Sequence, residues 1–541
     1  MLGLMQDRQL LLSRILRHSH RFHGEVEVVS YDRYGAATTM TYTDIHRRSC
    51  QLANSLRDSG IRLGERVATL AWNDHRHLEV YFAVTGIGAV CHTVNPRLHA
   101  DEIAYILNDA QDRIVFYDPA FAALVGAVRD RCPSVNLWIC TDRALGGEIE
   151  DVDYEDFIRL HSPEFVWPEF SEDTASSLCY TSGTTGRPKG VLTSHRSNML
   201  MILAMVAPDV FHLGARDAVL AVAPMFHVAS WGFPFAAPMV GAKLVLPGPD
   251  MSGSALFRAM DTQGVTIATG VSTVWIGVLD EIARQGRAPR GLQRASIGGA
   301  ACSAHAINTL EDYGIEVLHS WGMTELSPLG TLNQLKNHNQ HIDEAERRTL
   351  KLKQGRPPFG VDLRIVDDAG VELSWGSEVR GRLQARGYWA IERYFNQQQS
   401  AVDTDGWLDT GDIALIDGEG YMQIVDREKD MIKSGGEWIS SLELERIAAG
   451  HPDISDVAAI GLPHARWQER PVLVAVAVPR VVLDEQAVLA YVKAHVASWQ
   501  VPNRVIQVAV MPKTGTGKTD KKVLRQQYRD LLTEHPAGAT S

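Results

Sequence analysis

Short apolar runs alternate with helical patterns between about residue 40 and residue 330. The run "RVATLAWN" (66–73), for example, precedes "HLEVYFAVTGIGAV" (77–90), whose apolar residues recur at helical spacing. Further strand-like runs are "RIVFYD" (113–118), "NLWICTD" (136–142), "DAVLAVAP" (217–224) and "AKLVLPG" (242–248). Alternation of this kind predicts an α/β fold in which helices cover parallel sheets.

The pattern changes between about residue 360 and residue 425. "VDLRIVDDAGVEL" (361–373) carries a turn signal at 367–370, and "EVRGRLQARG" (378–387) and "YMQIVDR" (421–427) follow with little helical pattern between them. Strand-like runs separated by turn residues predict an antiparallel β subdomain.

A third pattern, a small α+β unit, begins after residue 428. It predicts a helix near 441–450, strands at 456–461 and 472–479, a helix over 484–499 and a last strand at 504–510. We place the domain boundary between Arg427 and Asp430, which gives a large N-terminal domain, 1–428, and a small C-terminal domain, 429–541.

Composition and charge narrow the class of protein. The chain has 541 residues, 45% of them hydrophobic, which is enough for a large core and more than one domain. Its formal net charge is −12, and the sequence contains no long block of Lys and Arg residues. This excludes a nucleic-acid binder held by phosphate contacts, and it means that local positive groups must meet any anionic ligand.

The cysteines and the N-terminus indicate the compartment. The six cysteines lie apart, without C-x-x-C spacing, which predicts reduced and mostly buried thiols. Gln6, Asp7, Arg8 and Arg14 interrupt the apolar character of the N-terminus, so it lacks the core of a signal peptide. The most apolar window, 224–246, contains His227 and several prolines, which argues against a membrane span. We expect a cytoplasmic protein.

The strongest local signal is "YTSGTTGRPKG" (180–190), which follows the strand-like "ASSLCY". Glycines let backbone N–H groups approach an anion closely, hydroxyl groups add donors, and Arg187 and Lys189 add positive charge. A flexible surface turn is the alternative, and it would be favoured for "SGTTG" alone. With Arg-Pro-Lys-Gly attached, the segment predicts a phosphate-binding loop.

A second stretch, "MPKTGTGKTDKK" (511–522), contains Gly-Lys-Thr, the ending of the P-loop motif. The P-loop needs a Gly five residues before its Gly-Lys pair, and Pro512, which has no N–H group, stands there. The residues after Lys518 suggest only a short basic helix. We therefore reject a P-loop, and Lys518 needs another role; the alternative is a solvated lysine near the chain end.

These segments identify a family resemblance. "YTSGTTGRPKG" resembles the phosphate loop of the acyl-adenylate-forming superfamily, which includes acyl-CoA synthetases, luciferases and the adenylation domains of peptide synthetases. Further segments resemble the later family motifs in the same order and extend the likeness over nearly the whole chain: "SWGMTELSP" (320–328), "GWLDTGDIA" (406–414), "VDREKDMIKSGGEWIS" (425–440) and "PKTGTGKTDKK" (512–522).

The resemblance implies an acid–thiol ligase that works in two steps. A carboxylate first attacks the α-phosphorus of ATP to give an acyl-adenylate and pyrophosphate, and a thiol then takes the acyl group. It implies Lys518, Thr324 and Glu325 as catalytic residues, with Glu325 holding Mg²⁺. It implies ATP contacts from Thr181, Ser182, Gly183, Thr184, Thr185, Lys189, Gly299, Ala300, Trp321, Gly322, Met323, Asp412 and Arg427.

Three further segments resemble one branch of the family, the synthetases for medium-chain and longer fatty acids: residues 73–103, "MFHVASWGFPF" (225–235) and "LKQGRPPFGVDLRIVD" (352–367). This branch also holds ligases for short sulfur-containing acids such as 3-methylmercaptopropionate. The likeness implies a pocket at His227, Trp231 and Gly299, with His227 as an aromatic gate; Ala229, Phe233 and Phe235 add apolar character. His227 as a plain core residue is the alternative. The branch often has Gly-Pro-Trp where this chain has Gly387, Tyr388 and Trp389.

For the second step the resemblance implies that the C-terminal domain rotates about a hinge at Lys429. Lys518 would then leave the site, and "KSGGEWIS" (433–440) would replace it, with coenzyme A contacts from Lys433, Ser434, Gly435, Gly436, Glu437 and Trp438. Lys433, Arg466 or Lys521 would meet the coenzyme A phosphates.

Other functions stay open at this stage. The acyl group could pass to a carrier-protein thiol, or the protein could be a binder without catalysis, although the intact Lys189, Glu325, Asp412 and Lys518 argue against the binder. The partners that we expect are a small carboxylic acid, ATP and coenzyme A, without nucleic acid or an integral membrane segment, and the sequence allows a homodimer.

Overall fold

The structure is a computed structural model, and it describes Met1 and residues 3–143, 151–181, 187–299, 302–376, 379–435, 437–514 and 518–532. The chain divides into two compact units. The first contains Met1–Leu363 and Ala385–Leu408, and the second contains Arg364–Gln384 and Asp409–Ser541. The predicted boundary at residue 428 lies within the second unit and stays a prediction, because it concerns movement rather than packing.

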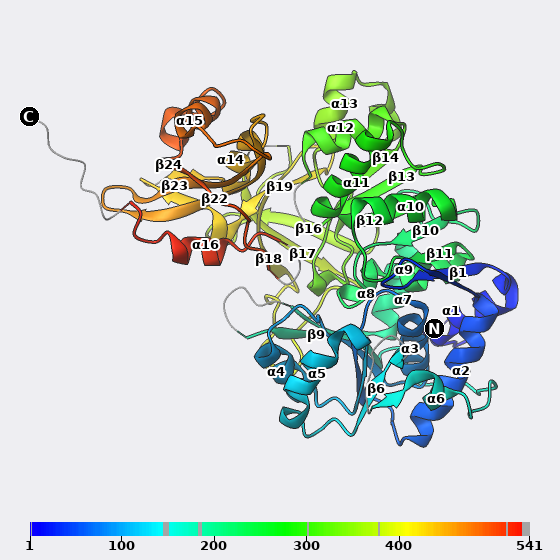
Figure 1. The fold of residues 1–541 in the computed structure, drawn as a ribbon. Coiled ribbons are helices and arrows are strands. Elements are labelled where there is room, and N and C mark those ends of the chain that lie inside the picture. The colour runs from blue at the N-terminus through cyan, green and yellow to red at the C-terminus, as the bar shows by residue number, and fades with distance from the viewer. Residues whose placement is uncertain are drawn as a thin grey trace, which may run out of the picture. The chain divides into compact units, whose positions relative to one another are not determined.

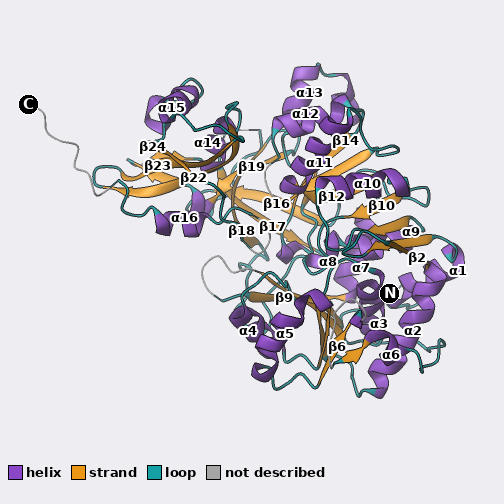
Figure 2. Cartoon of the chain, viewed as in Figure 1, coloured by secondary structure: helices purple, strands orange, loops and turns teal. Residues whose placement is uncertain are grey.

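The first unit contains two large, mostly parallel sheets (Figures 1 and 2). The eight-stranded sheet has the order β15 (Thr331–Leu332), β14 (Glu316–Trp321), β13 (Arg294–Gly298), β12 (Ile267–Val271), β10 (Ala218–Ala221), β11 (Lys243–Leu246), β1 (Glu27–Tyr31) and β2 (Ala37–Thr41). The seven-stranded sheet has the order β7 (Val152–Asp153), β6 (Leu137–Cys140), β5 (Ile114–Tyr117), β3 (Arg66–Leu70), β4 (Val90–Thr93), β8 (Ala175–Thr181) and β9 (Lys189–Ser194).

The antiparallel pairs of these two sheets are β1 with β2, β14 with β15, and β8 with β9; the other strand pairs are parallel. The strands expected at 66–73, 113–118, 136–142, 217–224 and 242–248 all form, so the predicted α/β fold is confirmed. Parallel strands need crossover connections, and helices provide them.

Most helices of the first unit begin at a residue whose side chain caps the helix, as α2 illustrates. Thr41 accepts a hydrogen bond from the N–H of Asp44, whose carboxylate accepts one from the N–H of Thr41, which is a complete capping box. The helices are α1 (Ser13–His23), α2 (Tyr42–Asp58), α3 (His75–Gly86), α4 (Ala100–Ala110), α5 (Ala122–Val128), α6 (Tyr154–Ile158), α7 (His195–Met205), α8 (Val228–Trp231), α9 (Phe233–Val240), α10 (Gly253–Gln263), α11 (Ser272–Gln285), α12 (Ala304–Asp312) and α13 (Glu344–Lys351).

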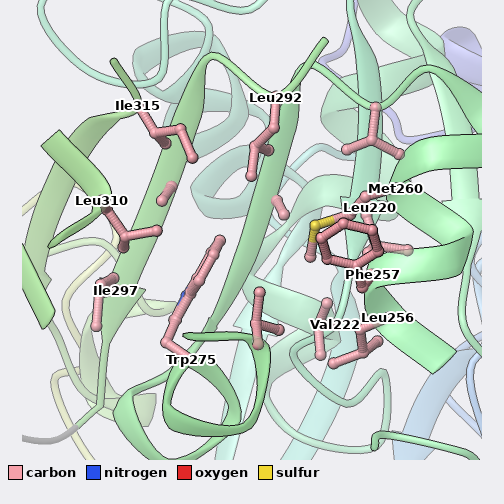
Figure 3. Packing of buried hydrophobic residues seen from close by; sticks show 14 of the residues in the cluster. Leu220, Val222, Leu256, Phe257, Met260, Trp275, Leu292, Ile297, Leu310 and Ile315 are labelled. Atoms are coloured by element: carbon pink, nitrogen blue, oxygen red, sulfur yellow. The ribbon is translucent and has the colours of Figure 1, made fainter. Parts of the chain in front are cut away.

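The cores of the first unit lie between the sheets and these helices. One cluster joins β10, β12 and β13 to α10, α11 and α12 and includes Trp275, Phe257 and Met260 (Figure 3). The Nε1–H of Trp275 donates to the carbonyl oxygen of Ser296 at 3.1 Å, so this large side chain is buried without an unsatisfied donor. All six cysteines are free and buried, as predicted.

The second unit contains most of a four-stranded sheet and a five-stranded one. The first has the order β16 (Val361–Val366), β17 (Gly381–Gly387), β18 (Leu408–Ile416) and β19 (Met422–Arg427), and the predicted turn at 367–370 is present, with Gly370 at φ 83°. The other contains β21 (Glu437–Ile439), β20 (Ile432–Ser434), β23 (Gln468–Ala477), β22 (Ile454–His464) and β24 (Arg504–Gln507).

Three helices accompany the five-stranded sheet: α14 (Ser441–Ala448), α15 (Glu485–Lys493) and α16 (Lys521–Gln527). The helix expected over 484–499 is too long, because α15 ends at Lys493 and a separate 3-10 turn covers Ser498–Gln500. The last strand is likewise shorter than expected, since β24 ends at Gln507. Among the described residues no helix is long and apolar enough to cross a membrane.

The stability of the first unit depends on a buried neutral histidine. The side chain of His195, the first residue of α7, is fully buried, and burial lowers its pKa from 6.5 to about 4. Its Nδ1 accepts a hydrogen bond from the N–H of Leu12 at 3.2 Å. Protonation would place a second donor against that N–H group, so the folded state favours the neutral ring.

We predict that this histidine makes stability fall with pH. Because its pKa is lower in the folded state, its contribution is complete above pH 6.5 and is lost as the pH falls from 6.5 towards 4, by about 2 kcal/mol at pH 5. Thermal unfolding of His195→Gln should therefore show a smaller decrease in Tm between pH 7 and pH 5 than the unchanged protein. An equal decrease in both would contradict the assignment.

Candidate functional site

The hairpin of β8 and β9 holds the two ends of the predicted phosphate loop. Thr181, the last residue of β8, pairs with Lys189, the first residue of β9. Ser182, Gly183, Thr184 and Thr185 lie outside the described residues. Antiparallel pairing thus brings Thr181 and Lys189, which stand eight positions apart, to one end of the hairpin.

Gly190 lets a distant segment pack against this hairpin. A Cβ atom on Gly190 would lie 3.0 Å from Cβ of Phe395 and 3.2 Å from Cζ of Tyr180, closer than such atoms normally approach. The N–H of Phe395 donates to the carbonyl oxygen of Gly190 at 2.8 Å. A larger residue at position 190 would displace the segment that carries Phe395.

The same segment reaches Glu325, the predicted magnesium ligand. The N–H of Ile391 donates to the carbonyl oxygen of Glu325 at 3.0 Å, and the hydroxyl group of Tyr394 donates to its Oε1 at 2.9 Å. The amine of Lys189 lies 4.7 Å from the centre of the Tyr394 ring. Tyr394 therefore stands between two predicted site residues that are far apart in the sequence.

Tyr394 is a site residue that sequence reasoning missed. Burial and the nearby Glu325 carboxylate both raise its pKa, so its hydroxyl group stays protonated and donates. The segment "IERYF" (391–395) fits the family, but no motif assigns a role to its tyrosine. Only the contact of 391–395 with Glu325 and Lys189 identifies it.

Glu325 lies in a short 3-10 helix, Thr324–Leu326, and is 8% exposed. Within the described ranges, no group of three or more His, Cys, Asp or Glu residues could hold a metal ion. Mg²⁺ usually binds through one or two carboxylates together with substrate phosphates and water. A single partly shielded carboxylate beside a phosphate loop fits that requirement.

The predicted adenine residues lie at the ends of two neighbouring strands. Gly298 ends β13 and Trp321 ends β14, and Gly299 has φ 77°. A Cβ atom on Gly322 would lie 1.7 Å from the carbonyl oxygen of Pro328, so only glycine fits there. Trp321 is 9% exposed and its ring packs against Gly330. Ala300 lies outside the described residues, and Met323 is partly buried.

Trp231 and Gly299 of the predicted acyl pocket lie together. Cζ2 of Trp231 is 3.9 Å from the position of a Cβ atom on Gly299, and its Cη2 is 3.2 Å from that position on Gly298. His227 precedes the turn that carries Trp231. Phe233 packs against Phe211 in the core, with ring centres 4.9 Å apart, and the side chain of Ala229 lies outside the described residues.

In the second unit, the predicted ribose residues meet across two antiparallel strands. Asp412 of β18 is the cross-strand partner of Arg427 of β19, and Nε of Arg427 lies 2.6 Å from Oδ1 of Asp412. Asp412 is 2% exposed. The oxygens of an ionised aspartate accept hydrogen bonds, which is the property that a partner of ribose hydroxyl groups needs.

Lys518 belongs to the same unit, and its pKa is lowered to about 8. Burial of the amine is the first cause, and repulsion from Arg427 and Lys429 acts in the same direction, while Asp412 opposes both. Lys518 as a whole is exposed to solvent, which weakens the effect of burial on the pKa of its amine. The repulsion from Arg427 and Lys429 is therefore the more important cause of the lowered pKa. Arg427, Lys429 and Lys518 form a cluster of cations suited to an anion.

Within the stretch 511–522, the described residues on either side of 515–517 pair with each other, and 515–517 themselves lie outside the description. Lys513 and Thr519 form a β-bridge, and the N–H of Thr514 donates to the carbonyl oxygen of Lys518 at 2.7 Å. The Lys513 amine lies 2.7 Å from Asp456 of β22. The predicted short basic helix follows as α16.

Ion pairs fix the elements on either side of Lys518. The Lys521 amine lies 2.7 Å from Glu445 and from the hydroxyl group of Ser441, and Arg525 pairs with Asp430 next to the predicted hinge at Lys429. Lys521 is thus held inside the unit, which leaves Lys433 and Arg466 as the candidates for the coenzyme A phosphates.

The predicted coenzyme A segment forms the hairpin of β20 and β21. Lys433 pairs with Trp438 and Ser434 with Glu437, and Gly435 turns the chain with φ 63°, while Gly436 lies outside the described residues. A Cβ atom on Gly435 would lie 2.7 Å from the ring of Trp467. Trp438 and Trp467 are both exposed, and Trp467 is a second residue that sequence reasoning did not assign.

Comparisons with known proteins identify the family. The AMP-binding enzyme family matches residues 16–395, and the AMP-binding enzyme C-terminal domain matches residues 443–518. The chain therefore belongs to the AMP-binding enzyme family. The predicted superfamily and the predicted enzyme class, an acid–thiol ligase, are confirmed.

Curated relatives are similar over their whole length. The chain is 45% identical to a medium-chain-fatty-acid–CoA ligase of Ectopseudomonas oleovorans, covering 98% of both chains. It is 46% identical to a 3-methylmercaptopropionyl-CoA ligase of Ruegeria pomeroyi, covering 98% of this chain and 100% of the relative. An anthranilate CoA ligase in complex with anthranoyl-AMP shares the fold, with a TM-score of 0.86 over 99% of both chains at 23% identity.

We predict that Tyr394 positions Glu325 for the first step. Tyr394→Phe removes one hydrogen bond to a carboxylate, which should slow pyrophosphate release roughly tenfold and raise the Mg²⁺ concentration required. Thioester formation from supplied acyl-adenylate should stay unchanged. Tyr388→Phe is the matched control, because Tyr388 is exposed and lies outside the segment 391–395 that contacts Glu325. Equal loss in both steps would indicate a merely structural role.

We also predict that adenylate formation decreases above pH 8. Lys518 must be protonated to meet a phosphate oxygen, and with a pKa of about 8 its charge is lost as the pH rises through that value. Pyrophosphate release measured without coenzyme A avoids the titration of the thiol. Lys518→Arg keeps its charge, so its residual rate should lack this decrease; the same alkaline decrease in both proteins would refute the assignment.

Proposed function

We propose that this protein is an ATP-dependent fatty acyl-CoA ligase that acts on medium-chain acids. It activates the acid as an acyl-adenylate with release of pyrophosphate, and it then transfers the acyl group to coenzyme A with release of AMP. The observation that carries the proposal is the 45% identity to a medium-chain-fatty-acid–CoA ligase over 98% of both chains. Lys189, Glu325, Asp412 and Lys518 are all present.

In the first step a carboxylate oxygen forms a bond to the α-phosphorus of ATP, and the bond to the pyrophosphate oxygen breaks. Thr181, Lys189 and the loop between them bind the β- and γ-phosphates, and Thr324 contacts the α-phosphate. Glu325 would hold Mg²⁺, which neutralises phosphate charge when bound. These groups act chiefly by positioning and by stabilising the charge that develops on phosphate oxygens.

Two groups of residues are assigned to the nucleoside, one to its ribose and one to its adenine. Asp412 accepts hydrogen bonds from the ribose hydroxyl groups, and Arg427 both fixes Asp412 and adds a donor. Gly299, Ala300, Trp321, Gly322 and Met323 line the adenine pocket. The ion pair of Asp412 and Arg427 at 2.6 Å supports this assignment, because it orients both groups before ATP binds.

The second step needs a thiol where the first needed a lysine. Residues 429–541 rotate about Lys429, which withdraws Lys518 and brings the hairpin of Lys433, Ser434, Gly435, Gly436, Glu437 and Trp438 to the site. The thiolate sulfur then forms a bond to the acyl carbon, AMP leaves with the bonding electrons, and the thiol proton goes to solvent. Two glycines in that hairpin let the narrow pantetheine arm pass.

The acyl group enters beside His227, Trp231 and Gly299. The close packing of Trp231 on Gly298 and Gly299 supports a shaped apolar pocket at that place. A second candidate substrate is a short sulfur-containing acid, because 3-methylmercaptopropionyl-CoA ligases are as similar to this chain as the fatty-acid ligase. Transfer of the acyl group to a carrier-protein thiol is a further alternative. We also propose that the enzyme is cytoplasmic and forms a homodimer.

A panel of acids tests this function. Straight-chain acids from acetate to palmitate, with methylthio and aryl acids, are supplied with ATP, Mg²⁺ and coenzyme A, and AMP and thioester are followed together. We expect both products in equal amounts, with the highest kcat/KM for a medium-chain acid. AMP without thioester would contradict coenzyme A as acceptor, and no AMP with any acid would indicate a binder without catalysis.

Lys518→Ala divides the two steps within the same panel. It should abolish AMP formation from ATP and acid, because the cation at the α-phosphate is lost, and it should leave thioester formation from supplied acyl-adenylate unchanged. Equal loss in both assays would refute the movement of residues 429–541.

A further inference from the structure

A small cavity is lined in part by Val228 and Gly232, the two ends of the turn 228–232, which comprises α8 and the residue after it. Its volume is about 30 Å³, and a water molecule needs roughly 10–15 Å³, so it holds two or three groups of that size. One side is formed by Thr324 and Ser327, on either side of Glu325 and Leu326. The cavity therefore borders the segment that we assign to the α-phosphate. Its remaining walls are Tyr81, Thr93, Ser177, Cys179, Val191, Thr193, Asn198, Met201, Val228, Gly232 and Phe235.

The turn beside the cavity has a left-handed backbone. Val228, Ser230 and Trp231 have φ values of 46°, 48° and 55°, and Gly232 has φ 84°. A β-branched residue such as Val228 rarely adopts this conformation, so surrounding contacts must enforce it. Ser230 is fully buried, and its hydroxyl group donates to the carbonyl oxygen of Ala223.

Two methionines of helix α7 pack against this turn at Gly232. A Cβ atom on Gly232 would lie 2.9 Å from Cε of Met201 and 2.8 Å from Sδ of Met205. Met201 is 2% exposed and lines the cavity, whereas Met205 does not line it. The thioether end of Met201 thus closes the cavity against the backbone of Gly232.

The walls indicate which chemical groups fit. None of the lining residues is Asp, Glu, Lys, Arg or His, so a charged tail would find no partner. The hydroxyl group of Tyr81 donates to the carbonyl oxygen of Met225, and the amide of Asn198 donates to Ser176 and Thr193. These donors are satisfied within the protein. An uncharged aliphatic or thioether end suits such walls.

We propose that this cavity receives the end of the acyl group and that Met201 sets the limit of its length. The proposal rests on the proposed acyl-CoA ligase function and narrows its substrate class to unbranched acids whose last carbons fit this space. Chains that reach Met201 bind in the space of about 30 Å³. Longer chains must displace the Met201 side chain from Gly232.

Met201 is the most adaptable wall for a physical reason. Methionine is unbranched and rotates about three bonds, while Val191 and Thr193 stand on a paired strand. The other face of α7 also has open space, because Leu200, Leu203 and Ala204 line a separate cavity of about 700 Å³. The wall of the cavity that α7 forms can therefore move aside for a longer acyl chain, whereas the wall formed by β9 cannot.

The test compares three variants across straight-chain acids from butyrate to palmitate. Met201→Ala enlarges the cavity, and the ratio of kcat/KM for acids two to four carbons beyond the optimum to kcat/KM at the optimum should rise roughly tenfold or more. Val191→Leu fills the cavity and should shift the optimum to shorter acids by a similar factor. Met199→Ala, a buried methionine of the same helix outside the cavity lining, should leave the ratio unchanged.

Each outcome decides between the two levels of proposal. If the unchanged protein forms no AMP with any acid, the ligase function itself is wrong. If it forms acyl-CoA and both cavity variants keep its chain-length profile, the function stands and the role of the cavity is refuted. If Met201→Ala does not fold, Val191→Leu decides alone, with Tm measured for every variant. A shift equal to that of Met199→Ala would also overturn the proposal.

Discussion

Two backbone hydrogen bonds hold the two halves of the predicted phosphate site in register. The N–H of Phe395 binds the carbonyl oxygen of Gly190 on the β8–β9 hairpin, and the N–H of Ile391 binds that of Glu325. Backbone bonds are insensitive to side-chain identity, so this arrangement depends on the path of the chain from 391 to 395 and on the missing Cβ atom at Gly190. Tyr394, between these anchors, is brought against both Lys189 and Glu325.

The second unit solves a different electrostatic problem. Three cations, Arg427, Lys429 and Lys518, lie close enough to repel one another. Arg427 and Lys429 lower the pKa of Lys518, and Asp412 raises it. Such a cluster is costly to keep charged without an anion and is therefore suited to bind one. Ion pairs with Glu445, Asp430 and Asp456 fix the chain on either side of Lys518. These pairs hold the flanking segments in place although the cations repel one another.

Much of the fold and of the site could be predicted from the sequence. Alternation of apolar runs predicted the parallel strands, since buried strands and covering helices have distinct periodicities. Spacing excluded a P-loop at Lys518, because Pro512 lacks an N–H group. Ordered motifs predicted Asp412 and Arg427, which the structure places 2.6 Å apart.

The rest depended on contacts that no local pattern contains. Tyr394 acquires its partners from segments some seventy and two hundred positions away, so its tyrosine looks ordinary in the sequence. Helix α15 ends at Lys493 although its pattern continues, because the chain turns again at Ser498–Gln500 before β24. Propensity predicts that a helix exists better than it predicts where the helix ends.

Chain length is the property for which similarity is least informative. Ligases named for a medium-chain fatty acid and for 3-methylmercaptopropionate are 45% and 46% identical to this chain, so overall identity cannot separate the two substrates. An apolar pocket distinguishes one methylene by only about 1–3 kcal/mol, and a few side chains are enough to do so. The contact of Met201 with the left-handed turn at Gly232 is a place where one side chain would act on that free energy, and the hydrogen bond from Ser230 to Ala223 holds the same turn.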